Sequence, residues 1–219
     1  MQIRNLSDEN SLLNQFIKEI RDVTIQKDSM RFRCNVERIG EIMAYEISKT
    51  FPYQCETVTT PLGTTELNTF NTQVVIASIL RAGLPFHNGM LHYLDNAGNA
   101  FVSAFRRYTD DNHEKFDVHV EYIASPDLTD KTLLLCDPML ATGGSMELAY
   151  KALMSKGKPK RIHIASIIAS QPAIDFLQNY FQDTDTIIWT AAIDPKLNEH
   201  AYIVPGLGDA GDLAFGEKI

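Results

Sequence analysis

The feature that most constrains the fold of this chain is a set of short, uninterrupted apolar runs between residues 74 and 193. They occupy residues 74–80, 100–105, 132–136, 162–169 and 186–193. A continuous apolar run of this length is typical of a strand that is buried on both faces. Helical patterns separate several of the runs, around Met90, at 145–155 and at 173–177. This alternation predicts an α/β fold in which helices flank a parallel, twisted sheet.

The chain before the first run is predicted to form two helices and then a hairpin arm. Apolar residues recur at three- and four-residue spacing in two segments. They are Leu12, Leu13, Phe16, Ile17 and Ile20, followed by Val36, Ile39, Ile42, Met43 and Ile47. The second helix should end before Pro52, because the residue before a proline avoids helical geometry. Residues 53–72 are rich in threonine and contain Pro-Leu-Gly at 61–63, which predicts a small hairpin or flap.

We expect the whole chain to form one domain. Its 219 residues match one domain of generous size, and no linker or internal repeat divides it. The expected parts are N-terminal helices at 1–50, an α/β core at about 73–193 and a C-terminal hood at about 194–219.

Charge and composition argue against several classes of function. The formal net charge of −8 disfavours a nonspecific binder of nucleic acids or membrane surfaces. The three cysteines are widely spaced and form no Cys-x-x-Cys pair, which favours a reducing, cytoplasmic compartment. One of them, Cys136, lies in an apolar run and is predicted to be a buried apolar residue rather than a nucleophile. No run approaches the roughly 18 apolar residues that a membrane span requires.

Charged residues follow several of the predicted strands. In parallel sheets, ligands bind beyond the carboxyl ends of the strands. Residues that follow the apolar runs are therefore candidates for a binding site. They are Arg81, Arg106, Arg107, Asp137 and Asp194.

The most informative motif joins the run at 132–136 to the helical pattern that starts at residue 145. The strand ends in Asp137, and the following loop closes with Thr-Gly-Gly-Ser at 142–145. Glycines let consecutive N–H groups turn toward one point, and a helix N-terminus adds donors and a partial positive charge. An Asp-Pro or Gly-Gly pair alone usually marks only a turn. The combination of strand, carboxylate, loop and helix predicts a sugar phosphate site.

This loop is not the lysine-bearing loop of nucleoside triphosphate enzymes. That loop requires Gly-x-x-x-x-Gly-Lys-Ser/Thr, and no lysine follows Gly144. Neutral backbone and hydroxyl donors would hold the phosphate here, so a nucleoside triphosphate is disfavoured.

Two further segments carry binding chemistry. Arg81 follows a buried strand and precedes Gly83, which places a forked guanidinium where it can reach an anion. Near the C-terminus, residues 202–212 contain three glycines, one proline and two aspartates. Such a segment favours a rigid loop over regular structure, and its backbone groups suit the amide-like edges of a planar heterocycle.

Taken together, these segments resemble the uracil phosphoribosyltransferase family. The resemblance covers essentially the whole chain, and it is carried by residues 79–84, 137–145, 197–200 and 202–212. It implies the type I phosphoribosyltransferase fold and transfer of phosphoribosyl from phosphoribosyl pyrophosphate to uracil, which yields UMP and pyrophosphate. It also implies magnesium as cofactor and a homodimer or higher homo-oligomer, with no nucleic-acid or membrane partner.

The resemblance also implies roles for individual residues. Asp137, Arg81 and Asp209 would be catalytic. Asp137 would bind the ribose hydroxyls, and Arg81 and Arg106 the pyrophosphate. The 5-phosphate would lie against Ala141, Thr142, Gly143, Gly144 and Ser145. The binding site for phosphoribosyl pyrophosphate would also include Pro138, Met139, Leu140 and Asp209. Uracil would be bound by Ile203, Gly208, Asp209 and Ala210, largely through backbone atoms. No direct metal ligand is assigned: magnesium would be held through the pyrophosphate, with Asp209 as the candidate protein ligand.

Two departures from the family pattern leave other functions open. Leu213 stands where the family usually has a basic residue, and residues 116–122 contain no lysine where the family has one. Both departures lower the positive charge expected near a pyrophosphate. The alternatives are a catalytically weakened regulator that binds uracil or UMP, and a phosphoribosyltransferase for another base.

Overall fold

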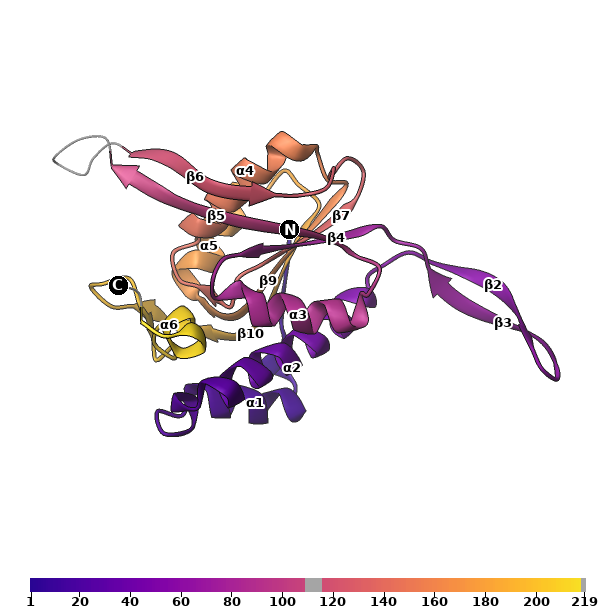
Figure 1. Ribbon diagram of the computed structural model, residues 1–219, viewed down its shortest axis with the longest axis horizontal. Coiled ribbons are helices and arrows are strands. Elements are labelled where there is room, and N and C mark those ends of the chain that lie inside the picture. The colour runs from indigo at the N-terminus through magenta and orange to yellow at the C-terminus, as the bar shows by residue number, and fades with distance from the viewer. Residues whose placement is uncertain (109–115, 218–219) are drawn as a thin grey trace.

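The computed structural model describes the backbone of residues 1–108 and 116–217, and the side chains of residues 1–103 and 121–217. Its centre is a twisted, mostly parallel sheet in the order β1-β10-β9-β7-β4-β5-β6, with β8 paired to β9 (Figure 1). The strands are β1 (Gln2–Asn5), β4 (Val74–Ile79), β5 (Gly98–Tyr108), β6 (Phe116–Ala124), β7 (Thr132–Cys136), β8 (Met139–Leu140), β9 (Arg161–Ser170) and β10 (Thr186–Asp194).

Helices cover both faces of this sheet (Figure 1). The helices on one face are α1 (Leu12–Arg21), α2 (Ser29–Ser48) and α3 (Gly83–Tyr93), and those on the other are α4 (Gly144–Leu153) and α5 (Gln171–Tyr180). Successive side chains of a strand point to opposite faces. Val74 and Ile76 of β4 accordingly pack in the core with α1 to α3, and Val75 and Ala77 pack in the core with α4 and α5.

Two smaller parts extend from this body. The antiparallel hairpin of β2 (Tyr53–Thr60) and β3 (Gly63–Phe70) projects away from the sheet (Figure 1). The C-terminal hood contains the short pair β11 (Lys196–Leu197) and β12 (Ile203–Val204), then α6 (Ala210–Phe215), which packs against α2.

The five predicted strands and the predicted fold class are confirmed. The hairpin at 53–72 is also confirmed, and α2 ends at Ser48, before Pro52 as expected. The strands β1 and β6 of the central sheet were not predicted from the sequence, nor were the two-residue strands β8, β11 and β12. The sheet is mixed because β6 runs antiparallel to β5. None of the described helices is long and apolar enough to cross a membrane.

Candidate active site

The order of the strands places the candidate site between β4 and β7. After β4 the chain adds β5 on one side, and it later adds β7 on the other side of β4. At such a switch point the two loops leave a crevice beyond the carboxyl ends of the strands. Because Ser78 of β4 pairs with Cys136 of β7, the segments that begin at Leu80 and Asp137 leave the sheet side by side. Arg81 and Asp137 are thus brought to the same edge.

Asp137 is a part-buried carboxylate at the end of β7. Its backbone N–H donates to Ala165 O at 3.1 Å, and its Oδ1 accepts from the N–H of Met139 at 3.3 Å. Burial raises the pKa of Asp137 to about 7, against a smaller lowering by the Met139 hydrogen bond and with a further increase from the negative charge of Asp209. Asp209, the other predicted catalytic carboxylate, is therefore near enough to Asp137 to act on its pKa through charge.

Carbonyl groups of the loop after Asp137 accept hydrogen bonds from β9 and from the end that β9 shares with α5. Pro138 O accepts from the N–H groups of Ile167 and Ile168, at 3.1 and 3.0 Å. Ala141 O accepts from Ser170 Oγ at 2.5 Å, and the same hydroxyl caps α5 by accepting from Ala173 N. These contacts fix the loop to β9 and α5, which a phosphate-binding loop requires if its donors are to be positioned before the ligand arrives.

Gly143 ends the loop and begins α4. Its φ of 82° is in the left-handed region, and a Cβ there would lie 2.7 Å from Phe176 Cδ1, so both conformation and space require glycine. Thr142 Oγ1 accepts from Gly144 N at 3.3 Å, and the Ser145 residue is exposed in the first turn of the helix. The N-terminus of a ten-residue helix thus opens at the end of the loop, a geometry that favours anion binding.

Arg81 is engaged by the hood in this structure. Its Nη2 lies 2.9 Å from Asp212 Oδ1, and its Nη1 donates to Gly216 O at 3.2 Å. Its Nε is buried and has no hydrogen-bond partner among the described residues. About a third of each side chain in the Arg81–Asp212 pair is exposed, at 37% and 34%. Sequence reasoning missed Asp212 because nothing in the sequence links two residues so far apart.

The hood brings the predicted uracil-binding residues together on a short loop. Ile203 and Ala210 are buried, while Gly208 is exposed with a φ of 94° and no atom within 4 Å of a Cβ built there. The carboxylate of Asp209 caps α6 by accepting from Asp212 N at 2.9 Å. The loop therefore has a fixed backbone with open space beside Gly208.

Three of the strand-end residues remain to be placed. Arg106 lies in β5 opposite Val118 of β6, and its side chain is outside the described residues, as is that of Arg107. Asp194 ends β10 and is buried, and its carboxylate binds Arg21 of α1 and the N–H of Gly206. Asp194 therefore connects the end of β10 to α1 and to the hood.

A buried polar cluster lies beneath the two strand ends. Ser78 Oγ is 2.9 Å from His87 Nδ1 and 3.0 Å from Cys136 Sγ, and His87 Nε2 is 2.7 Å from Asn99 Oδ1. Burial lowers the pKa of His87, opposed by the Asn99 hydrogen bond. The prediction that Cys136 is buried is confirmed. Burial also raises the pKa of its thiol to about 12, which disfavours the nucleophilic thiolate.

The donor groups of the site suit a magnesium ion that arrives with a phosphate ligand. Among the described residues, no three His, Cys, Asp or Glu side chains gather as a metal cage. The negative charge of Asp209 contributes to the raised pKa of Asp137, so these two carboxylates repel each other. Magnesium commonly binds one or two carboxylates together with substrate phosphates, and a cation here would relieve that repulsion.

Comparison with known proteins decides the family. The family described as uracil phosphoribosyltransferase matches residues 7–217 of the chain. The chain belongs to the uracil phosphoribosyltransferase family. A uracil phosphoribosyltransferase of Porphyromonas gingivalis is 63% identical over 219 residues, which is all of both chains. One from Sulfolobus acidocaldarius is 37% identical over 212 residues, 94% of this chain and 96% of its own length.

Solved structures share the fold of this chain. A protein of Aquifex aeolicus covers all of this chain and is itself covered in full, with a TM-score of 0.84 at 28% identity. An orotate phosphoribosyltransferase of Mycobacterium tuberculosis, solved with inorganic phosphate, has a TM-score of 0.50 at 11% identity and covers 85% of this chain and 91% of its own, a likeness of fold alone. Nothing in these comparisons favours a different base or a regulator without activity over uracil phosphoribosyltransferase activity.

Proposed function

We propose that the protein transfers the phosphoribosyl group of phosphoribosyl pyrophosphate to uracil and releases pyrophosphate. Full-length membership of the uracil phosphoribosyltransferase family supports this function. The structural observation that carries it is the placement of Asp137, its loop and Arg81 at neighbouring strand ends. An acceptor for ribose hydroxyls, donors for a phosphate and a cation for a leaving group are thereby gathered at one crevice.

In this proposal the loop after β7 holds the ribose 5-phosphate. Its donors are the N–H groups at 141–145, with the hydroxyls of Thr142 and Ser145 and the N-terminus of α4. Pro138, Met139 and Leu140 bring the chain from Asp137 to these donors, held by the contacts to β9 and α5. Asp137 accepts hydrogen bonds from the ribose hydroxyls and so orients the sugar.

Arg81 is proposed to neutralise the leaving pyrophosphate. The bond from the ribose carbon to the pyrophosphate oxygen breaks, a bond to a uracil ring nitrogen forms, and that nitrogen loses its proton. Negative charge develops on the leaving group and positive charge on the sugar, so positioning and charge stabilisation do most of the catalytic work. The unpartnered Nε of Arg81 supplies a donor for this purpose. Arg106 is assigned the same role from the family resemblance.

Magnesium is proposed as the cofactor, bound through the pyrophosphate. When bound, it would supply positive charge that stabilises the departing pyrophosphate. Asp209 is the candidate protein ligand. Its negative charge also acts on the nearby carboxylate of Asp137. The remaining contact residues of the hood, Ile203, Gly208 and Ala210, are proposed to bind uracil with backbone atoms, and the open space beside Gly208 supports this.

We further propose a cytoplasmic enzyme that forms a homodimer or a higher homo-oligomer. The hairpin arm supports self-association, because it projects from the body and exposes apolar side chains. They are Tyr53, Val58, Leu62, Leu67 and Phe70. Exposed apolar patches of this kind often mark protein interfaces. Light scattering coupled to size-exclusion chromatography tests the proposed oligomer, and a monomer at micromolar concentration would contradict self-association.

The direct test is UMP formation from uracil and phosphoribosyl pyrophosphate, with magnesium and with the metal chelated. We expect turnover in the wild type, its loss on chelation, and a fall of at least about 100-fold in Asp137→Asn, because the ribose loses a charged acceptor. No turnover in the wild type would overturn the proposed reaction. Unchanged turnover in Asp137→Asn would overturn only the role of Asp137.

A further inference from the structure

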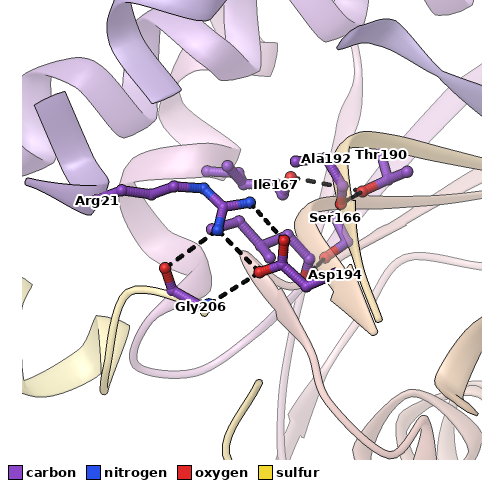
Figure 2. A network of polar contacts seen from close by, with 8 residues as sticks. Arg21, Ser166, Ile167, Thr190, Ala192, Asp194 and Gly206 are labelled. Atoms are coloured by element: carbon purple, nitrogen blue, oxygen red, sulfur yellow. Dashed lines mark hydrogen bonds and ion pairs between the residues drawn. The ribbon is translucent and has the colours of Figure 1, made fainter. Parts of the chain in front are cut away.

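A three-part polar contact joins the N-terminal helices, the central sheet and the hood (Figure 2). Arg21 is the last residue of α1, Asp194 is the last residue of β10, and Gly206 lies between β12 and α6. The guanidinium of Arg21 binds the carboxylate of Asp194 at both oxygens, at 2.8 and 2.9 Å. The same Asp194 Oδ2 accepts from Gly206 N at 2.9 Å, and Arg21 Nη1 donates to Gly206 O at 3.2 Å.

Burial makes this contact different from an ordinary surface ion pair. The Asp194 side chain is 7% exposed and the Arg21 side chain 21% exposed. A buried carboxylate that loses its cation is left uncompensated, so the surrounding structure must rearrange or admit water. The planar fork of arginine meets both carboxylate oxygens, which fixes direction as well as distance.

The contact uses both polar backbone groups of Gly206. Its φ of 57° is left-handed, and a Cβ there would lie 2.2 Å from Ile203 O, so the turn can be made only by glycine. Gly206 lies between Ile203 and Gly208, two of the proposed uracil contacts. The N–H and C=O of Gly206 already bind Asp194 and Arg21. Gly206 therefore fixes the course of the loop, and the neighbouring residues are left to bind the base.

A second contact from the N-terminal helices supports the same loop. The side-chain amide of Gln26, with its nitrogen facing the carbonyls, donates to Ile20 O at 2.8 Å and to Leu207 O at 3.0 Å. Arg33 Nη1 donates to Ala214 O in α6 at 2.6 Å. The hood is therefore anchored to α1, α2 and their connection. Of these contacts from the N-terminal helices, as far as the described residues show, the Arg21 contact is the one that also includes the end of a core strand.

We infer that Arg21 is a positioning residue for the base, acting through Asp194 and Gly206 to hold the uracil-binding loop at the correct distance from the sugar. This inference rests on the proposed function. Arg21 lies outside the segments to which substrate contacts are assigned, so its effect should fall on uracil and spare phosphoribosyl pyrophosphate, which binds at the ends of β4 and β7. A displacement of about 1 Å in such a loop can lower the rate by about 100-fold.

The chain offers a matched control. Arg31 binds Glu19 through two hydrogen bonds of 2.9 Å each, and the Glu19 side chain is only 9% exposed. That pair joins α1 to α2, and the hydrogen bonds given for its two side chains among the described residues stay within these helices. Replacing Arg31 thus removes a similar ion pair from the same helices while leaving the Gly206 turn in place.

The experiment compares Arg21→Ala, Arg21→Lys and Arg31→Ala with the wild type in steady-state kinetics. We expect KM for uracil to rise about tenfold or more in Arg21→Ala, and KM for phosphoribosyl pyrophosphate to stay within about twofold. Arg21→Lys should recover part of the loss, because it keeps the charge without the fork. Arg31→Ala should leave both constants near wild type. Equal rises of both constants in Arg21→Ala, or no rise, would overturn the inference.

Amide hydrogen exchange separates this inference from the proposed reaction. Peptides that cover residues 203–209 should exchange faster in Arg21→Ala than in Arg31→Ala, whether or not the wild type makes UMP. Unchanged exchange there would show that Arg21 does not hold the loop. An inactive wild type with faster exchange in Arg21→Ala would contradict the proposed reaction and leave the contact established.

Discussion

At the scale of single residues, two positions of the candidate site depend closely on their residue type. Asp137 is a carboxylate whose pKa is raised to about 7 by burial, with a further increase from Asp209. A buried carboxylate reduces stability when it is ionised, and such groups are often retained at functional sites. Gly143 adopts a left-handed φ beside Phe176, which glycine does without strain and other residues do not.

The Asp137→Asn variant should be more stable than the wild type at alkaline pH while losing activity. The folded pKa of about 7 lies above the ordinary value of 3.8, so the folded state binds this proton more tightly than the unfolded state does. The resulting stabilisation is complete below about pH 4 and is lost as pH rises through 7. Thermal unfolding of both proteins from pH 4 to 9 checks this. A difference in Tm that does not change with pH would contradict it.

Substitution of Gly143 should weaken both stability and phosphate binding. A Cβ at this position conflicts with the left-handed φ and with Phe176, so we expect Gly143→Ala to cost about 1–3 kcal/mol in the free energy of unfolding. KM for phosphoribosyl pyrophosphate should rise, because the loop and the first turn of α4 would shift. Gly63→Ala in the hairpin is the control, since a Cβ there meets no atom within 4 Å. Similar kinetics in the two variants would contradict the role of Gly143.

At the scale of elements, α6 of the hood and the loop after β4 are linked through one ion pair. Arg81, the proposed pyrophosphate-binding residue, is held by Asp212 and by Gly216 O. The substrate must therefore replace these contacts with its own oxygens. Because both side chains of the ion pair are about a third exposed, the pair should contribute no more than about 1 kcal/mol.

The Asp212→Asn variant should bind phosphoribosyl pyrophosphate more tightly than the wild type. We expect its KM to fall by up to about fivefold, the equivalent of about 1 kcal/mol, with a smaller difference at high salt. The cap of α6 should persist, because it uses the backbone N–H of residue 212. Glu46→Gln, which breaks an exposed pair with Lys49, serves as the control. A rise in KM would show that Asp212 assists binding instead of competing with it.

At the scale of the whole molecule, the sequence predicted the elements better than the contacts between them. The apolar runs predicted the strands because burial on both faces requires such composition. The alternation Phe-Asp-Val-His-Val-Glu-Tyr at 116–122 could have indicated β6, whereas β1 is too short and polar to signal a strand. The Arg81–Asp212 and Arg21–Asp194 pairs join distant parts of the chain and leave no local pattern to detect.

The packed core also predicts how stability responds to acid. His163 is buried and accepts a hydrogen bond from Trp189 Nε1 at 3.0 Å, and burial lowers its pKa from 6.5 to about 4. The unfolded chain binds a proton on His163 more tightly than the folded protein does. The stabilisation that comes from keeping His163 neutral is therefore present above pH 6.5 and is lost as pH falls toward 4. We expect His163→Gln to show a flatter decline of Tm over this range. His200→Gln is the control, because its side chain is 73% exposed.

The most direct test of the proposed function is the kcat/KM of the purified protein for uracil, cytosine, hypoxanthine and guanine, with phosphoribosyl pyrophosphate and magnesium in excess. We expect pyrophosphate release that depends on uracil, with UMP as the product. The kcat/KM for the other bases should be lower by at least about 100-fold, because backbone groups that pair with uracil would be left unpaired. Faster turnover with any other base, or no release of pyrophosphate with uracil, would contradict the proposed function.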